Sequence, residues 1–252
     1  MIMLPKDYIS VSQVLMYQRC PKQYAFRYID NIVYPPAVAL IEGKSHHKAL
    51  ELNNVQKIES HEDLKPETVV EKFCDTFSDS ASDIEDWESE TKDGVIARGK
   101  GLLETYMQSV SPTIQPVAVE REFHLPLSFS GNEVDVMGFI DVEQNDGLAD
   151  YKVVARTKSQ ADVDNDLQLA VYGCVTNKSS AENICMVKTK TPKIERVKTE
   201  ITPERGQWAA YVMSEVVKAI STGAFPPCDP TSWCCSEQFC GYWKHCRGKG
   251  KA

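Results

Sequence analysis

The segment from residue 115 to residue 155 constrains the fold most, because its apolar residues stop recurring at helical spacing and begin to alternate. The stretches "QPVAVEREFHLPLSF" (115–129) and "EVDVMGFIDVEQ" (133–144) are followed by "GLADYKVVA" (147–155). Alternation of apolar and polar residues is typical of β-strands, and the "QNDG" that joins the last two stretches is typical of a tight hairpin turn. The sequence therefore predicts three strands, of which the last two are antiparallel neighbours.

Helical patterns flank these strands on both sides. Residues 9–29 predict two short helices, with Ser10 or Ser12 as the cap of the first and Pro21 in the first turn of the second. The pattern also predicts helices at 37–56, 66–82, 99–110, 163–177 and 203–221, a loop at 82–94, and strands at 183–190 and 194–201. The sum is an α/β fold class, with a small mixed central sheet flanked by helices.

The charge of the chain is unevenly distributed. The 252 residues carry a net charge of −8, but residues 59–93 alone hold thirteen acidic and three basic residues, whereas residues 188–198 hold five basic residues and one acidic residue. A negative total argues weakly against a nucleic-acid partner, but this segregation leaves room for a basic surface. There is no apolar run as long as a membrane span, and the first residues lack the apolar core of a secretion signal, so we expect a cytoplasmic protein with no membrane partner.

Two aspartates and a lysine of the predicted hairpin lie on neighbouring segments with many apolar residues. Asp141 is near the end of one strand, whereas Asp150 and Lys152 are two residues apart in the next strand and so share a face of the sheet. In an antiparallel pair Asp141 can point at the same spot. Carboxylates suit Mg²⁺ or Mn²⁺, and a lysine beside them can orient water or stabilise charge on a phosphate. This pattern alone fits an alternative equally well, in which Asp141 is a turn residue and Asp150 and Lys152 form a surface ion pair.

The hairpin sequence "GFIDV…LADYK" (138–152) resembles the core of the PD-(D/E)XK nuclease superfamily, and specifically its RecB-like exonuclease branch. The resemblance implies a restriction-endonuclease-like core in which Asp141 is the first metal-binding acid. It implies that Asp150 and Lys152 are the paired acid and lysine of the active site. It also implies that the backbone carbonyl of Tyr151 is a further metal ligand.

Two helix motifs of this branch have counterparts in the chain. "GKSHHKALE" resembles the G-x-x-x-H motif, which implies that His47 is a metal ligand, while His46 is one position out of register. "DLQLAVYG" resembles the Q-x-x-x-Y motif, in which Gln168 and Tyr172 support the site and touch the nucleic-acid strand; the alternative is an exposed Gln168 and a core Tyr172. Glu120 matches an acid that is common on the preceding strand, and we expect it to form an ion pair near the site.

The carboxyl-terminal end is rich in cysteine. Five of the nine cysteines fall in the last twenty-five residues, and without a secretion signal such a cluster favours metal ligation over disulfides. The resemblance extends to AddB-like, CRISPR-associated and phage-type members that carry an iron–sulfur cluster. It implies a [4Fe–4S] cluster, with Zn²⁺ as the alternative occupant, on the ligands Cys20, Cys235, Cys240 and Cys246.

The remaining cysteines have other expected roles. Cys228 and Cys234 would be spare thiols beside the cluster, which would join the two ends of the chain. Cys74, Cys174 and Cys185 lie within predicted regular elements, and we expect them to be buried as small apolar residues.

The resemblance implies one RecB-like nuclease domain over residues 1–252. Residues 1–30 and 225–252 would be the cluster-binding segments, and residues 52–112 a helical, acidic insertion. The implied function is that of a metal-dependent DNA exonuclease, which uses Mg²⁺ or Mn²⁺ to hydrolyse phosphodiester bonds in recombination, repair, or phage or CRISPR DNA processing. Its implied partners are DNA with a free end and a recombination or adaptation protein.

Two alternative functions stay open on the sequence. One is an endonuclease of the same superfamily. The other is a non-catalytic module that binds DNA or a protein and keeps only the fold. The presence of Asp141, Asp150 and Lys152 together argues against the module.

Overall fold

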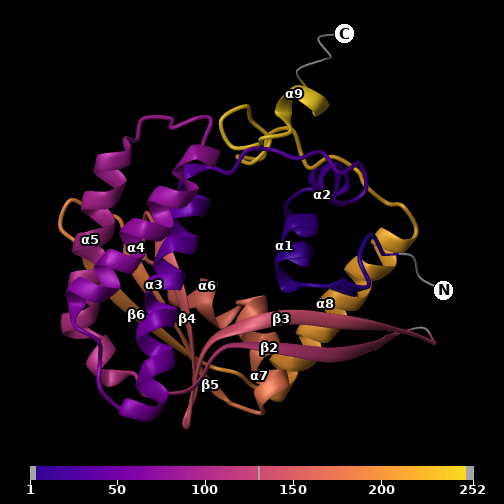
Figure 1. The fold of residues 1–252 in the computed structure, drawn as a ribbon. Helices are drawn as coiled ribbons and strands as arrows, with labels where there is room; N and C mark the ends of the chain where they lie inside the picture. Colours follow the sequence, from indigo (N-terminus) through magenta and orange to yellow (C-terminus); the bar gives the residue numbers. More distant parts are fainter. Residues whose placement is uncertain (1–3, 130, 248–252) are drawn as a thin grey trace. The chain divides into compact units, whose positions relative to one another are not determined.

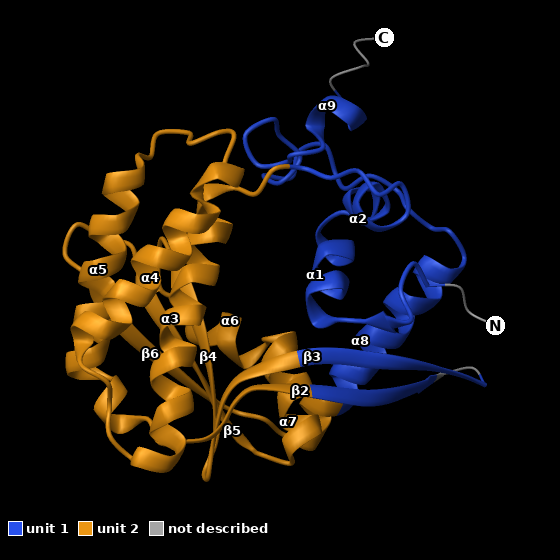
Figure 2. Ribbon diagram, viewed as in Figure 1, with its two compact units in different colours: residues 1–34, 123–138, 207–252 blue, residues 35–122, 139–206 orange. Residues whose placement is uncertain are grey.

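The computed structural model describes residues 4–129 and 131–247, and the chain divides into two compact units (Figures 1 and 2). The larger unit comprises residues 35–122 and 139–206, and the smaller unit comprises residues 1–34, 123–138 and 207–252. Within the described part of the chain, no helix has the length and apolar character needed to cross a membrane.

A mixed sheet forms the middle of the larger unit. Its strands are β2 (Pro116–Phe129), β3 (Asn132–Gln144), β4 (Leu148–Val154), β5 (Ser180–Val187) and β6 (Lys193–Glu200), with β2 and β3 continuing into the smaller unit. β3 and β4 form the predicted antiparallel hairpin, in which Val142 lies opposite Ala149. β4 and β5 are parallel, β5 and β6 are antiparallel, and β2 pairs with β3. The expected mixed central sheet of an α/β fold is therefore confirmed.

Helices flank the sheet in the larger unit. They are α3 (Val38–Ser60), α4 (Pro66–Ser80), α5 (Lys92–Ser109), α6 (Gln160–Asp164) and α7 (Leu167–Thr176). Of these, α3 and α7 contact β4. α3, α4 and α5 lie side by side (Figure 1) and share an apolar core with Ala149 and Tyr151 of β4. Asp150 and Lys152 alternate with these residues and so face the other way, where Lys152 contacts α7.

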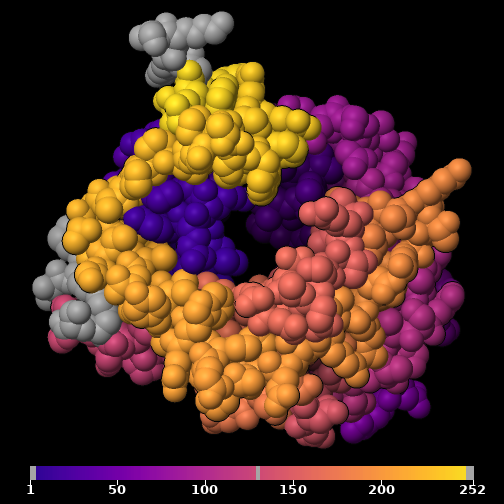
Figure 3. All heavy atoms as spheres, turned by 180° about the vertical axis from the view of Figure 1, so that it is seen from behind, coloured from indigo at the N-terminus to yellow at the C-terminus, as the bar shows by residue number. Residues whose placement is uncertain are grey.

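The smaller unit joins the two ends of the chain. Its elements are β1 (Tyr8–Ile9), α1 (Val11–Arg19), α2 (Pro21–Tyr28), most of α8 (Pro203–Ser221) and α9 (Trp243–Cys246). The Tyr17 hydroxyl donates to the Ala224 carbonyl, and the Lys22 N–H donates to the Pro226 carbonyl. The carboxyl-terminal segment (yellow) therefore lies against the amino-terminal helices (indigo), as Figure 3 shows.

Several predicted boundaries differ from the structure: the strand expected at 183–190 is Ser180–Val187, and α3 runs on to Ser60. Two further differences have a clear local cause. The single helix expected at 163–177 is two helices, because the Asp166 carboxylate accepts hydrogen bonds from two N–H groups in the first turn of α7 and starts a new helix there. α5 begins at Lys92, inside the expected loop, because the Thr91 hydroxyl accepts from the Gly94 N–H and caps it. Ser10 is the cap of α1, as one of the two expected candidates.

Candidate functional site

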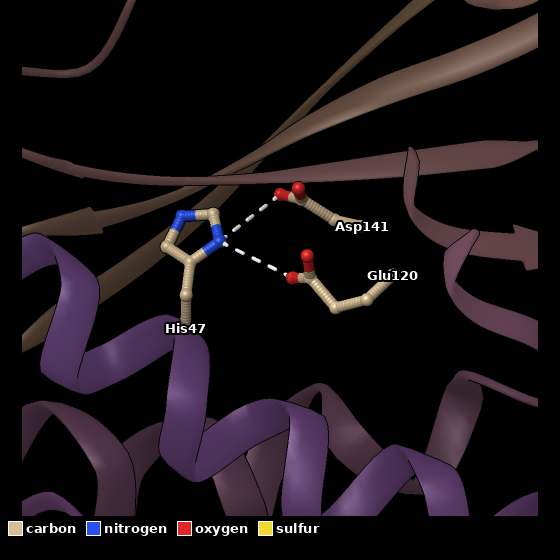
Figure 4. A group of neighbouring side chains, drawn as sticks. All are labelled: His47, Glu120 and Asp141. Carbon is tan, nitrogen blue, oxygen red and sulfur yellow. Dashed lines mark ion pairs between the residues drawn. The ribbon is translucent and has the colours of Figure 1, made fainter. Parts of the chain in front are cut away.

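Three elements of the larger unit bring ligand-type side chains together. His47 comes from α3, Glu120 from β2 and Asp141 from β3, and one ligand atom from each lies within 4.8 Å of the others (Figure 4). His47 Nδ1 is 3.5 Å from Asp141 Oδ2 and 3.9 Å from Glu120 Oε1. The side chains of His47 and Glu120 are 32% and 30% exposed, so a solute can reach the group.

The peptide of Tyr151 connects this group to β4. The Tyr151 N–H donates to Asp141 Oδ2 at 2.8 Å, and the Tyr151 carbonyl is 3.0 Å from His47 Nε2. Because a carbonyl can only accept, Nε2 carries the proton in this hydrogen bond. His47 Nδ1 therefore faces the two carboxylates, and the carbonyl keeps a second lone pair.

Asp150 and Lys152 form the second half of the site. Lys152 Nζ lies 2.9 Å and 2.6 Å from the two carboxylate oxygens of Asp150 and donates to Gln168 Oε1 at 3.0 Å. Gln168 Nε2 donates in turn to the Tyr172 hydroxyl at 2.6 Å, and that hydroxyl donates to the Phe139 carbonyl. The hydrogen bonds thus run from β4 through α7 to β3.

Burial makes negative charge costly in the site. Loss of water and then the nearby charge of Asp150 raise the pKa of Asp141 to about 7, against the lowering effect of His47 and Lys152. Burial alone would lower the pKa of His47, but the nearby carboxylate of Glu120 and the charges of the two aspartates outweigh that effect and raise it. A positive partner is therefore favoured at this position.

Lys152 keeps its positive charge despite its surroundings. Burial would lower the pKa of its ammonium, but the charges of Asp150 and Asp141 outweigh burial, and the pKa lies above its ordinary value. At neutral pH the group is therefore a fixed cation and a hydrogen-bond donor.

The donor set fits a divalent cation. Imidazole nitrogen together with carboxylate and carbonyl oxygen is a ligand combination that suits Mn²⁺ and, through the oxygens, Mg²⁺. The crowding of Asp141 and Asp150, which raises the pKa of Asp141, is the condition that a cation between them would relieve. The Tyr151 peptide bonds to His47 and Asp141, whereas Asp150 bonds to Lys152 and is not a member of the group of His47, Glu120 and Asp141. Lys152 is linked in turn to Gln168 and Tyr172.

His46 and Glu120 lie in different surroundings. His46 is fully buried, bonds to the Glu42 carbonyl through Nδ1 and packs on the ring of Phe73, so it lies away from the group. Glu120 forms the expected ion pair with His47, but it also belongs to the ligand group, which the sequence analysis did not predict. Its backbone has φ +45°, a conformation rare for a non-glycine residue, and no sequence pattern announces it.

Cysteines gather at one place in the smaller unit. Six of them line a single pocket: Cys20, Cys228, Cys234, Cys235, Cys240 and Cys246. The neighbours that raise the pKa of the Cys240 thiol, after burial itself, include Cys20, Cys246 and Cys235. Cys228 Sγ lies 3.9 Å from Cys234 Sγ.

The cysteines outside this pocket differ in exposure. Cys185 is buried as expected, and Cys74 is partly buried. Cys174 is exposed, so the expectation that it is buried is wrong: it lies in the last turn of α7, after the buried residues, the last of which is Gly173.

Comparisons with known proteins give one family and a fold likeness. The sequence model of the PD-(D/E)XK nuclease superfamily matches residues 8–247. No curated protein matches the chain. The crystal structure of the "Putative exonuclease" from Eubacterium rectale has a TM-score of 0.56 and 14% identity, over 91% of this chain and 87% of that one. The crystal structure of SSO0001 has a TM-score of 0.49 and 11% identity, over 98% of this chain and 89% of that one. The likeness to the first structure concerns the fold.

Proposed function

Because the chain belongs to the PD-(D/E)XK nuclease superfamily, whose members are metal-dependent nucleases, we propose that it is a DNA exonuclease of the RecB-like branch. The observation that carries this proposal is the convergence of His47, Asp141 and the Tyr151 peptide beside the Asp150–Lys152 pair. A neighbour of similar fold that is named "Putative exonuclease" supports the choice of an exonuclease.

The cation would be held by His47, Asp141, Asp150 and the carbonyl of Tyr151, with Glu120 as a fifth candidate. Bound there, Mg²⁺ or Mn²⁺ would lower the pKa of a water and offset charge on the phosphate. Histidine ligation favours Mn²⁺ somewhat. Glu120 is 30% exposed and close to His47 Nδ1, so it can act either as a ligand or as the partner that orients the imidazole.

Lys152 would act as a cation rather than as a base. Its pKa lies above the ordinary value, so Nζ holds its proton at neutral pH and can donate to an attacking water or to a phosphate oxygen. Gln168 and Tyr172 would hold Lys152 in place, because they link it to the Phe139 carbonyl by consecutive hydrogen bonds. Their contact with the nucleic-acid strand is part of the proposal.

The cysteine pocket would hold a [4Fe–4S] cluster on Cys20, Cys235, Cys240 and Cys246, with Zn²⁺ as the alternative. Cys240 lies near the other three, whereas Cys228 lies near Cys20 and Cys234 in the same pocket, so the choice of these four ligands rests on the resemblance. Thiolates suit both occupants. The cluster would be structural and would hold together the ends of a single nuclease domain over residues 1–252, with 1–30 and 225–252 as its binding segments.

The setting is proposed from the resemblance to the RecB-like branch. The substrate would be cytoplasmic DNA with a free end, in recombination, repair, or phage or CRISPR DNA processing, together with a recombination or adaptation protein. A cleavage assay distinguishes an exonuclease from an endonuclease and from a non-catalytic binding module. Linear and circular single-stranded DNA, and linear duplex DNA, are incubated with Mg²⁺, Mn²⁺ or EDTA.

The expected result is degradation of linear DNA with Mn²⁺ or Mg²⁺, no degradation in EDTA, and loss of activity in Asp150→Asn. Cleavage of the circle would favour the endonuclease. No cleavage of any substrate with either cation would favour the binding module. Lys218→Met, on an exposed part of α8, is the control variant that should cleave like the wild type.

A further inference from the structure

Buried polar side chains lie beneath β4, on the face opposite Asp150 and Lys152. Tyr151 stands between these residues in the strand, so its side chain points into the core that it shares with α3, α4 and α5. It is 2% exposed, and its ring meets that of Tyr106 edge-on. A buried hydroxyl costs free energy unless it is hydrogen-bonded, so its partners matter.

Two partners hold the hydroxyl of Tyr151. Asn54 Nδ2 of α3 donates to it at 2.9 Å, and the Tyr106 hydroxyl of α5 lies 2.7 Å away. Both partner residues are 0% exposed. Buried polar groups that satisfy one another specify one arrangement of the packed elements, because a shift of either helix would leave a group unpaired.

The same contacts continue to a buried ion pair at the far end of α3. Tyr106 lies close to Ser111, and Ser111 Oγ donates to Asp63 at 2.6 Å. Lys57 of α3 lies 2.8 Å from Asp63 and donates to the Ser111 carbonyl at 2.7 Å. Lys57 is 3% exposed, so its charge depends on these partners. The register of α3 against α5 and β4 is therefore set by polar contacts and not by apolar packing alone.

α3 holds Tyr151 at two points. His47 and Asn54 are seven residues apart, which is about two helical turns, so they share a face of α3. His47 bonds to the carbonyl of Tyr151, and Asn54 bonds to its hydroxyl. The N–H of the same residue bonds to Asp141. A shift of the Tyr151 side chain would therefore displace the peptide that orients both His47 and Asp141.

We propose that Tyr151 is a positioning residue whose hydroxyl, held by Asn54 and Tyr106, fixes the peptide between His47 and Asp141 and so sets the affinity of the site for its cation. The inference rests on the proposed function, because it needs a divalent cation at this group. It assigns a role to a side chain that lies in the core and touches neither metal nor DNA.

Mn²⁺ alone is the probe, and its binding to the full chain without DNA is measured from the electron paramagnetic resonance signal of free Mn²⁺. Tyr151→Phe removes only the hydroxyl and should raise the Kd for Mn²⁺ roughly tenfold. Tyr106→Phe removes one of the two partners and should raise it less. At saturating Mn²⁺ the cleavage rate of Tyr106→Phe should approach that of the wild type.

The matched control is Tyr24→Phe. Tyr24 is also 0% exposed, and its hydroxyl bonds to Gln13 at 3.2 Å in the smaller unit. Thermal unfolding of each variant measures how much stability is lost with a buried hydrogen bond. Tyr24→Phe should show a similar loss of stability. Its Kd for Mn²⁺ should equal that of the wild type.

Asp150→Asn separates failure of the inference from failure of the proposed function. If Asp150→Asn loses Mn²⁺ but Tyr151→Phe binds it as tightly as the wild type or as Tyr24→Phe, the positioning role is overturned and the metal site stands. If Asp150→Asn binds Mn²⁺ as the wild type does, the metal site itself is overturned, and the inference falls with it. Should Tyr151→Phe not fold, Tyr106→Phe is judged by the same criteria.

Discussion

At the scale of single residues, the site depends on charges that burial makes costly and that neighbours offset. Lys152 is the clearest case, because the same aspartates that need a cation keep its ammonium protonated. An ammonium fixed beside Asp150 repels a metal ion, yet it can stabilise charge that develops on a phosphate. Its contribution should therefore appear in the chemical step and not in metal binding.

Lys152→Met tests whether Lys152 acts in the chemical step and not in metal binding. Cleavage at saturating Mn²⁺ should fall about 10²- to 10³-fold, because a preorganised donor to the transition state is lost. The Kd for Mn²⁺ should stay the same or decrease, since a like charge has been removed. Single-turnover cleavage and Mn²⁺ titration measure the two effects. A variant that cleaves normally, or that loses activity only through weaker Mn²⁺ binding, would contradict the role given to Lys152.

At the scale of elements, α3 contributes most to the position of the site, because it carries His47. Buried polar groups anchor this helix both before and after His47. Five residues before His47, the Glu42 carboxylate is fully buried and receives two hydrogen bonds of 2.9 Å from Arg98 of α5. Lys188, just after β5, lies 3.3 Å from the same carboxylate. The start of α3 is thereby joined to α5 and to the end of β5.

The ion pairs of Glu42 predict that the free energy of unfolding decreases at acidic pH. Burial alone would raise its pKa, but the hydrogen bond and charge of Arg98 and the charge of Lys188 outweigh it, so the pKa lies below its ordinary value of 4.5. A carboxyl whose pKa is lower in the folded state stabilises the protein above its unfolded pKa, and this stabilisation is lost as the pH falls through the folded pKa.

Urea unfolding measures the effect in the wild type and in Glu42→Gln. At pH 7 the variant should be less stable by about 3 kcal/mol, because a buried ion pair has lost one partner. The difference should narrow as the pH falls below 4.5. Glu215→Gln, whose carboxylate is 50% exposed in a pair on α8, is the control and should be neutral. A constant difference at all pH values would contradict the explanation.

The elements of the site could be predicted from sequence where the signal is local. The hairpin follows from alternation and "QNDG", and Gln168 and Tyr172 share a face because they are four residues apart on one helix. The glycine of "GFID" has a reason that only packing reveals: a Cβ on Gly138 would meet the ring of Phe123 at 2.9 Å.

Features that depend on contacts between distant segments could not be predicted. Glu120 reaches the ligand group through a left-handed backbone conformation within a strand, which its sequence neighbours do not signal. The partners of Tyr151 lie 45 and 97 residues away along the chain. The capping of α7 by Asp166 was visible in the sequence in principle, but the continuous apolar pattern across 163–177 concealed the break.

At the scale of the whole molecule, residues 20–26 and residues 227–247 line the cysteine pocket of the smaller unit together. The Tyr242 hydroxyl donates to the Ile32 carbonyl, and Phe26 stacks on Tyr242, so the carboxyl-terminal segment has protein contacts there as well as thiols. A group bound to thiols from both ends would close a loop of more than two hundred residues, which limits the freedom of the unfolded chain most in the simple loop-closure account.

Anaerobic purification followed by iron and zinc analysis tests the proposed cluster. The wild type should carry about four iron atoms and be brown, and Cys240→Ser should lose the metal and unfold at a lower temperature. Cys228→Ser, in the same pocket but outside the proposed ligand set, should keep its iron. Stoichiometric zinc without iron would favour the Zn²⁺ alternative, and loss of metal in Cys228→Ser would contradict the ligand set.

The central claim is that one divalent cation binds among His47, Asp141, Asp150 and the Tyr151 carbonyl. Crystals soaked in Mn²⁺ test it most directly, through the anomalous diffraction signal of manganese. We expect the strongest anomalous peak within this group, and its absence in crystals of Asp141→Asn. A strongest peak elsewhere in a protein that still cleaves DNA with Mn²⁺ would contradict the claim.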